Sequence, residues 1–236
     1  MRILVPTRRL VLFAALFALA LLITLPLRLV LGAGDGVITA REATGSVWSG
    51  SLKEARLGPA SLGDLSARLS PLALLTGQAR IEVERPSGAA DRFAGAFATS
   101  ARRRSAESVT GMVPVEGLFG ALPIASIELT DVTVRFRDDQ CDRAEGLVRA
   151  TLSSGADGLP LPASVSGAAR CDRGALLLPL ASGSGAEGVA LRIFGDGRYS
   201  AELRVRASEP DLVARLTGAG FSTGPGGYVL TIGGRF

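Results

Sequence analysis

Apolar and polar residues alternate along most of the chain after about residue 40. In the stretch "SIELTDVTVRFRDD", Ser126–Asp139, Ile127 and Leu129 fall on one face, and the alternation resumes at Val132. Such a period of two is typical of a strand with one buried and one wet face. The phase changes at Thr130–Asp131, which predicts a bulge or a tight bend within the strand.

The clearest hairpin is predicted for Val189–Ser208, "VALRIFGDGRYSAELRVRAS". Two alternating runs flank Asp196–Gly197, a pair suited to the positive φ angles of a tight turn. Similar patterns predict further strands at Leu65–Leu69, Ala79–Val83, Leu147–Leu152, Ala175–Pro179 and Tyr228–Ile232.

Helical patterns are short. Ser70–Pro71 is a helix start that opens "LALLTG", with Ser as the cap and Pro at the first position. A second helix is predicted for Ser208–Gly218, and a third for Val115–Leu122. We therefore expect a mainly β fold, a curved antiparallel sheet with a few short helices, forming either an open trough or a sandwich.

The N-terminal segment differs from the rest. Leu10–Leu27 is an uncharged run of 18 residues, enough for a helix of about 27 Å, and Arg2, Arg8 and Arg9 precede it. The positive-inside rule predicts residues 1–9 as a cytoplasmic tail, 10–31 as a transmembrane anchor, 32–40 as a linker and 41–236 as a periplasmic β-rich domain.

A cleaved signal peptide is the alternative for this segment. Ala18-Leu19-Ala20 has the small-x-small pattern of a cleavage site, but three large apolar residues follow it, and "LGA", Leu31–Ala33, is a poor site. We favour a retained anchor, and in both cases the body is exported.

Charge argues against nucleic-acid binding. The net charge is +4, but four arginines precede residue 35 where there is no acid, and the remaining 22 basic residues face 22 acidic ones. The one basic run, Arg102–Arg104, has no aromatic residues among it and is interpreted as a solvated loop.

The cysteines fit an exported body. Cys141 and Cys171 are the only two, and an oxidising periplasm favours a disulfide between them, worth about 3–4 kcal/mol in the chain-entropy model. A metal site is not expected, because two thiolates without any His leave a tetrahedral site incomplete.

Two sequence patterns match known catalytic or cofactor motifs. "GFSTG", Gly220–Gly224, fits G-x-S-x-G, but Ser222 has no His to take its proton and no helix pattern after it. "GSGAEG", Gly183–Gly188, fits G-x-G-x-x-G, but a strand pattern follows where a dinucleotide site needs a helix. Both are interpreted as loops.

The acidic pair Asp138–Asp139 is the remaining candidate for chemistry. Adjacent strand residues point to opposite faces, and Arg137 and Arg143 are near enough in sequence to neutralise the two carboxylates. We interpret the pair as a polar turn, and we expect no enzyme activity, no metal and no cofactor.

Trp48, the only Trp, lies between Gly45 and Gly50, close to the only Lys, Lys53. We interpret it first as a core plug at the membrane-proximal end of the sheet, and second as a docking anchor for a partner. A stacking platform for a sugar or base is the third reading.

An ordered set of segments resembles protein N of the bacterial type II secretion system. The set runs from "TGSVWSGSL" and "LGDLSARLSPLALLTGQARIEVE" through "CDRAEGLVRATL", "SVSGAARCDRGALLLPLASGSG" and "LRIFGDGRYSAELRVR" to "GGYVLTIGGRF". The resemblance covers residues 40–236. It implies an inner-membrane protein with a short cytoplasmic tail and a periplasmic β-rich body, and it brings no catalytic residues.

The resemblance implies contacts with other secretion components, such as the inner-membrane platform, the secretin or its connector, and the sheet edges are natural docking sites. The body is also similar to the open-trough sheets of AsmA-like envelope proteins. That similarity supports the alternative function, a trough that binds lipid or another apolar ligand.

Overall fold

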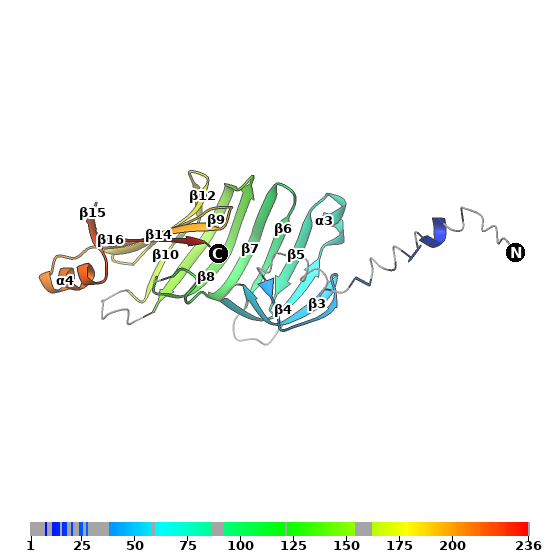
Figure 1. Ribbon diagram of the computed structural model, residues 1–236, viewed down its shortest axis with the longest axis horizontal. Helices are drawn as coiled ribbons and strands as arrows, with labels where there is room; N and C mark the ends of the chain where they lie inside the picture. Colours follow the sequence, from blue (N-terminus) through cyan, green and yellow to red (C-terminus); the bar gives the residue numbers. More distant parts are fainter. Residues whose placement is uncertain are drawn as a thin grey trace.

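The computed structural model contains one antiparallel sheet that runs through the body of the chain (Figure 1). It describes residues 8, 11–14, 16–17, 20, 24–25, 27, 38–57, 60–85, 92–120, 122–153 and 162–235. Within these residues the sheet has 16 strands in the order β1-β3-β4-β5-β6-β7-β8-β9-β10-β12-β13-β14-β16-β15, with β2 on β3 and β11 on β12.

The strands are β1 (Ile38–Thr39), β2 (Glu42–Ser46), β3 (Ser49–Leu57), β4 (Ala60–Leu69), β5 (Ala79–Glu84), β6 (Ala94–Thr99), β7 (Arg103–Pro114), β8 (Ile124–Arg137), β9 (Gln140–Leu152), β10 (Ser164–Ala168), β11 (Arg170–Asp172), β12 (Ala175–Ala181), β13 (Glu187–Ile193), β14 (Arg198–Val205), β15 (Ser222–Gly224) and β16 (Gly227–Arg235). Most neighbours in the sheet are also neighbours in sequence, so the chain folds as a meander. The predicted curved antiparallel sheet is confirmed, as one continuous sheet rather than the two sheets of a sandwich.

The alternation along the sequence becomes the two faces of the sheet. On β14, every second residue from Tyr199 to Val205 is buried, and the residues between them are not. The predicted hairpin with β13 is confirmed, because Val189 to Ile193 pair with Leu203 to Tyr199. Its turn contains Gly197 at φ +84°, which a residue with a Cβ adopts only with strain.

The predicted bulge at Thr130–Asp131 is confirmed. The β8–β9 register shifts between Thr130 and Thr133, and Asp131 has a φ of 48°. A matching irregularity lies beside it on β7, where Ser108 has a φ of 49°. Threonine hydroxyls accept hydrogen bonds from the backbone N–H groups that the bulges displace. The N–H of Ser108 donates to Thr133 Oγ1, and the N–H of Asp131 donates to Thr110 Oγ1, each at 3.0 Å. Aligned bulges of this kind bend the sheet.

Gly146 on β9 completes the bend. Its φ is +105°, and a Cβ at this position would lie 2.5 Å from the carbonyl oxygen of Asp131 and 2.6 Å from the Cα of Val132. The backbones of β8 and β9 approach each other here to a distance that excludes any side chain.

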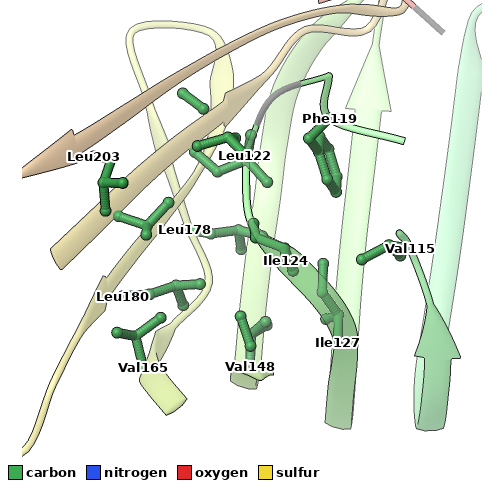
Figure 2. Close-up of a cluster of buried hydrophobic side chains, with 14 of the residues drawn as sticks. Val115, Phe119, Leu122, Ile124, Ile127, Val148, Val165, Leu178, Leu180 and Leu203 are labelled. Carbon is green, nitrogen blue, oxygen red and sulfur yellow. The ribbon is translucent and has the colours of Figure 1, made fainter. Parts of the chain in front are cut away.

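The larger core cluster fills the space inside the curl, between β8–β10 and β12–β14 (Figure 2). Leu178, Leu180 and Leu203 approach Ile124 and Val148 from the opposite side of this space. The sheet therefore buries its apolar face largely against itself, and this burial stabilises the curl.

The segment between β7 and β8 contributes buried side chains to this core. The prediction of a helix at Val115–Leu122 is wrong: residues 116–120 form turns, with Gly117 and Gly120 at positive φ, which an α-helix does not accommodate. Val115, Phe119 and Leu122 are nevertheless buried in the cluster (Figure 2). The Phe119 ring meets Tyr199 of β14 edge to face, with centroids 5.4 Å apart.

The two other predicted helices are confirmed as α3 (Pro71–Leu75) and α4 (Pro210–Gly218). Each begins with Pro at its first position, which the sequence predicts for Pro71. Ser70 precedes α3 in an extended conformation, but its side chain makes no capping hydrogen bond.

The predicted anchor lies in a part of the chain of which few residues are described. Val11–Ala14 and Leu16–Phe17 are helical, and their side chains are exposed. Among the described residues, no helix combines the length and the apolar composition needed to cross a membrane.

Gly146→Ala should lower the free energy of unfolding by about 3 kcal/mol, because the added methyl group meets the β8 backbone at a positive φ. Gly183→Ala is the matched control, since nothing lies within 4 Å of its Cβ position. It should change stability by less than about 0.5 kcal/mol. Chemical denaturation of both variants measures the difference, and equal midpoints would contradict the close approach.

Candidate interaction surface

The two motif-like stretches are parts of hairpins. Ser222 begins β15, and its exposed hydroxyl donates to the carbonyl of Val229 at 3.3 Å. Gly183–Gly188 covers the turn between β12 and β13 and the first two residues of β13, which begins at Glu187. Neither stretch precedes a helix, so the geometry of a nucleophile elbow or a dinucleotide loop is lacking at both positions.

Asp138 and Asp139 form the turn between β8 and β9, as predicted, with φ of 49° and 61°. Their cationic partners differ from the prediction. Asp138 accepts a hydrogen bond from Arg102 at 2.9 Å, and Asp139 lies 3.7 Å from Arg104. The basic run is therefore not simply a solvated loop: its second residue begins β7, and it neutralises the neighbouring turn.

Arg137 and Arg143 pair with other acids. Arg137 lies 3.7 Å from Asp142, and Arg143 donates to both oxygens of Glu145 at 2.8 and 3.0 Å. All four side chains are more than 40% exposed, so each pair adds less than about 1 kcal/mol to stability.

Charged residues also line a hollow of about 330 Å³ on the wet face of β4–β7. Arg80 is half-buried and binds Glu107 across β6, and it lies 3.7 Å from Glu82. Arg68 lies 4.0 Å from Glu84. The lining contains two arginines and three glutamates, all of them in ion pairs, so no unpaired cation is left there to hold an anionic ligand.

The disulfide and several turns meet at one rim of the sheet. Cys141 on β9 and Cys171 on β11 are bonded, with sulfurs 2.01 Å apart, as predicted. Arg104 of β7 donates to the carbonyl of Gly195, in the β13–β14 turn, at 3.0 Å. The contact between Arg104 and Gly195 joins parts of the sheet that are several strands apart, so it holds the curl, while the disulfide ties β9 to the nearby β11.

Two carboxylates at this rim have a lowered pKa. A hydrogen bond from Arg192 lowers the pKa of Asp172, and a hydrogen bond from Arg198 lowers that of Asp196. Arg235 of β16 adds to the second effect through its charge, and its guanidinium donates to the backbone carbonyl of Asp196 at 3.1 Å. Arg198 thus binds the carboxylate of Asp196, and Arg235 binds the backbone of the same residue.

Trp48 lies at the other end of the sheet, in the two-residue turn between β2 and β3. It is half-buried and packs against a second core cluster, which contains Val47, Leu52, Leu65 and Leu27. The backbone N–H of Val47 donates to the carbonyl of Leu25 at 3.0 Å. The end of the predicted anchor therefore touches the sheet beside Trp48, a contact that the sequence pattern did not indicate.

The sheet has two edges in the described part of the chain. At the first, two ion pairs of 2.9 Å each reach residues of β3: Arg41, between β1 and β2, pairs with Glu54, and Glu42 of β2 pairs with Lys53. The hydrogen bond from Lys53 to Glu42 also raises the pKa of the lysine. At the second edge, only β15 covers the outer side of β16, and it reaches no further than Val229. The sequence does not indicate that the outer side of β16 is unpaired, because this depends on which strands pair in the folded sheet.

No three His, Cys, Asp or Glu side chains lie close enough to hold a metal ion in the described part of the chain. The family model for type II secretion system (T2SS), protein N, matches residues 37–231. This chain belongs to the type II secretion system protein N family. Neither the curated proteins nor the solved structures include a match.

Membership of the protein N family implies that the chain takes part in type II secretion and contacts other components of that system. The match spans the sheet from just before β1 into β16. Within the family body, the structure offers surfaces for contacts: a charge-balanced wet face, a rigid rim, and an edge strand that is largely uncovered.

Trp48→Ala should lower the free energy of unfolding by about 2–3 kcal/mol, because the ring is half-buried against the second core cluster. Trp48→Phe keeps an aromatic ring and should lose less. Thermal unfolding measures both. Normal stability of Trp48→Ala together with weaker binding to a secretion component would instead identify the ring as a docking anchor.

Proposed function

We propose that this protein is a single-pass inner-membrane protein whose β body lies in the periplasm and contacts other type II secretion components. Residues 1–9 form the cytoplasmic tail and 10–31 the anchor segment, of which residues 10–24 cross the membrane while Leu25 and Leu27 pack on the sheet. Residues 32–40 are a linker, and the remainder is the body. Its role in the export of folded proteins is structural, through protein–protein contacts, and not enzymatic.

The anchor is supported by the described residues of the N-terminal segment. Val11, Leu12, Phe13, Leu16 and Phe17 are 56–72% exposed. Exposed apolar side chains gathered on one short segment need an apolar environment, and a bilayer supplies it. The arginines before this segment favour a cytoplasmic N-terminus.

The observation that carries the contact role is the family match to a body in which charges are mutually paired and the motif-like stretches form hairpins. Ser222 lies in a hairpin, Asp138 and Asp139 are neutralised by arginines, and the sequence has no His. The resemblance points to the inner-membrane platform, the secretin or its connector as partners.

One observation favours the alternative, a trough for lipid or another apolar ligand. On β5 and β6, Ile81 and Phe97 are register partners on the apolar face, and Phe97 is 39% exposed. Ile81 itself packs against the second core cluster, and the apolar face farther along the sheet is buried in the larger cluster. Lipid bound to the detergent-free body in native mass spectrometry would support this alternative.

The redox state of the cysteines tests the topology. In intact cells the full chain should contain the Cys141–Cys171 disulfide, since the periplasm is oxidising. Alkylation with a maleimide before lysis should then leave both cysteines unmodified. A variant without residues 2–31 should stay in the cytoplasm and react at both. Free thiols in the full chain would place the body in the cytoplasm.

Photo-crosslinking from the body tests the contact role. A photoreactive residue in place of Arg135 on β8, in the full chain within secreting cells, should give crosslinks to the platform, the secretin or its connector, identified by mass spectrometry. The same position in cells that lack the other secretion components is the control. Crosslinks to phospholipid alone would favour the trough.

A further inference from the structure

The outer side of β16 has backbone hydrogen-bonding groups that no strand in the described part of the chain pairs with. β15 pairs only with Gly227 to Val229, and β16 continues to Arg235. In an antiparallel pair, successive residues direct their N–H and C=O groups alternately to the two neighbouring strands. The direction at each position therefore follows from the turns that flank these strands.

Two turns agree on which residues of β16 direct their N–H and C=O groups away from β14. Phe194 donates to the carbonyl of Arg198, so Arg198 faces β13 and Tyr199 faces β16, where its register partner is Gly234. Gly224 and Gly227 close the β15–β16 turn, so Gly227 and then every second residue face away from β14. The outward-facing residues beyond β15 are therefore Thr231, Gly233 and Arg235.

This edge lacks the usual protection against strand addition. The register with β14 runs through eight consecutive pairs without a bulge, and β16 contains no Pro. Gly233 and Gly234 present no side chains to an incoming backbone. The opposite edge of the sheet differs, since β1 has two residues and ion pairs flank β2.

The surroundings of the edge define what can bind. On the core face, Leu230 and Ile232 are half-buried at the margin of the larger cluster, and an adjacent apolar side chain would complete their burial. On the rim, Arg198 bonds the carboxylate of Asp196, and Arg235 donates to the backbone carbonyl of the same residue. Among the described residues, two guanidinium groups therefore lie beside one carboxylate, and Arg235 forms no ion pair of its own with it.

We propose that the outer edge of β16, Leu230–Arg235, binds an extended segment of another polypeptide by strand addition. The segment alternates apolar and polar residues and carries an acidic residue opposite Arg235. A second copy of β16 does not meet this requirement, because Gly227–Arg235 contains no acid. The inference rests on the proposed function and names the site and chemistry of one secretion partner.

A proline at position 233 tests the edge directly. Gly233→Pro removes an outward N–H group, leaves the N–H groups that face β14, and fits sterically, because the nearest atom to a Cβ there is 3.5 Å away. With a photoreactive residue at Thr231 in the full chain, in secreting cells, the crosslink to the partner should fall about tenfold. Gly233→Ala keeps the N–H group and should retain the crosslink.

The charge requirement has its own variant. Arg235→Gln keeps a hydrogen-bond donor for the carbonyl of Asp196 but removes the positive charge. It should weaken the Thr231 crosslink about threefold, and the loss should shrink as salt rises.

The outcomes separate the two levels of the proposal. An unchanged Thr231 crosslink in Gly233→Pro, or a product containing only a second copy of the chain or lipid, would overturn strand addition. If the Arg135 crosslinks to secretion components persist in that case, the proposed function stands. If Arg135 gives none in the unmodified chain, the proposed function falls as well.

Amide exchange decides the question if Gly233→Pro fails to fold. In the purified full chain, the Gly233 amide should exchange faster than the Gly234 amide, which faces β14. Addition of the crosslinked partner's soluble domain should slow exchange at Gly233. Equal and slow exchange at both glycines without any partner would contradict an open edge.

Discussion

The curl of the sheet depends on the places where β7, β8 and β9 depart from regular pairing. Ser108 and Asp131 are residues with side chains held at positive φ, a conformation that costs free energy unless the surroundings compensate. Here threonine hydroxyls accept the N–H groups that the bulges release. With these bends the apolar face turns inward, and the sheet can cover itself without a second sheet or a layer of helices.

The contacts at the rim and in the core hold that bend from two sides. Inside, Phe119 and Leu122 fill the concave space, and Tyr199 packs on Phe119. Outside, the hydrogen bond from Arg104 to Gly195 joins parts of the sheet that are several strands apart, and the disulfide ties β9 to the nearby β11. These contacts are far apart in sequence, so they restrict motions that a simple meander, with its local pairings, would permit.

Sequence patterns predicted those parts of the fold that depend on neighbours in the chain. The strands around Ile127–Phe136 and Tyr199–Val205 were visible because large apolar residues alternate with charged ones. β6, with the sequence "AGAFAT", was not visible, because small residues give little contrast between the faces. Turn and capping residues identified Asp196–Gly197, the proline start of α3 and the closing glycine of α4.

Features that depend on distant residues were not predictable in the same way. The partners of Asp138 and Asp139 come from a strand about 35 residues earlier in the chain, and the nearer arginines are drawn to other acids. The apolar residues of Val115–Leu122 suggested a helix, but they are buried by strands on both sides without one. The unpaired side of β16 depends on the pairing of all the other strands, which the local sequence does not determine.

The contact between Leu25 and Val47 changes the geometry expected at the membrane. Leu27 is buried in the sheet's second core cluster, so the last part of the uncharged run belongs to the body. A helix over the remaining residues, 10–24, would span about 22 Å, less than the hydrocarbon thickness of a typical bilayer. Under the proposed topology, this mismatch draws the Trp48 end of the sheet against the lipid headgroups. The orientation of the body relative to the membrane is then restricted by this contact.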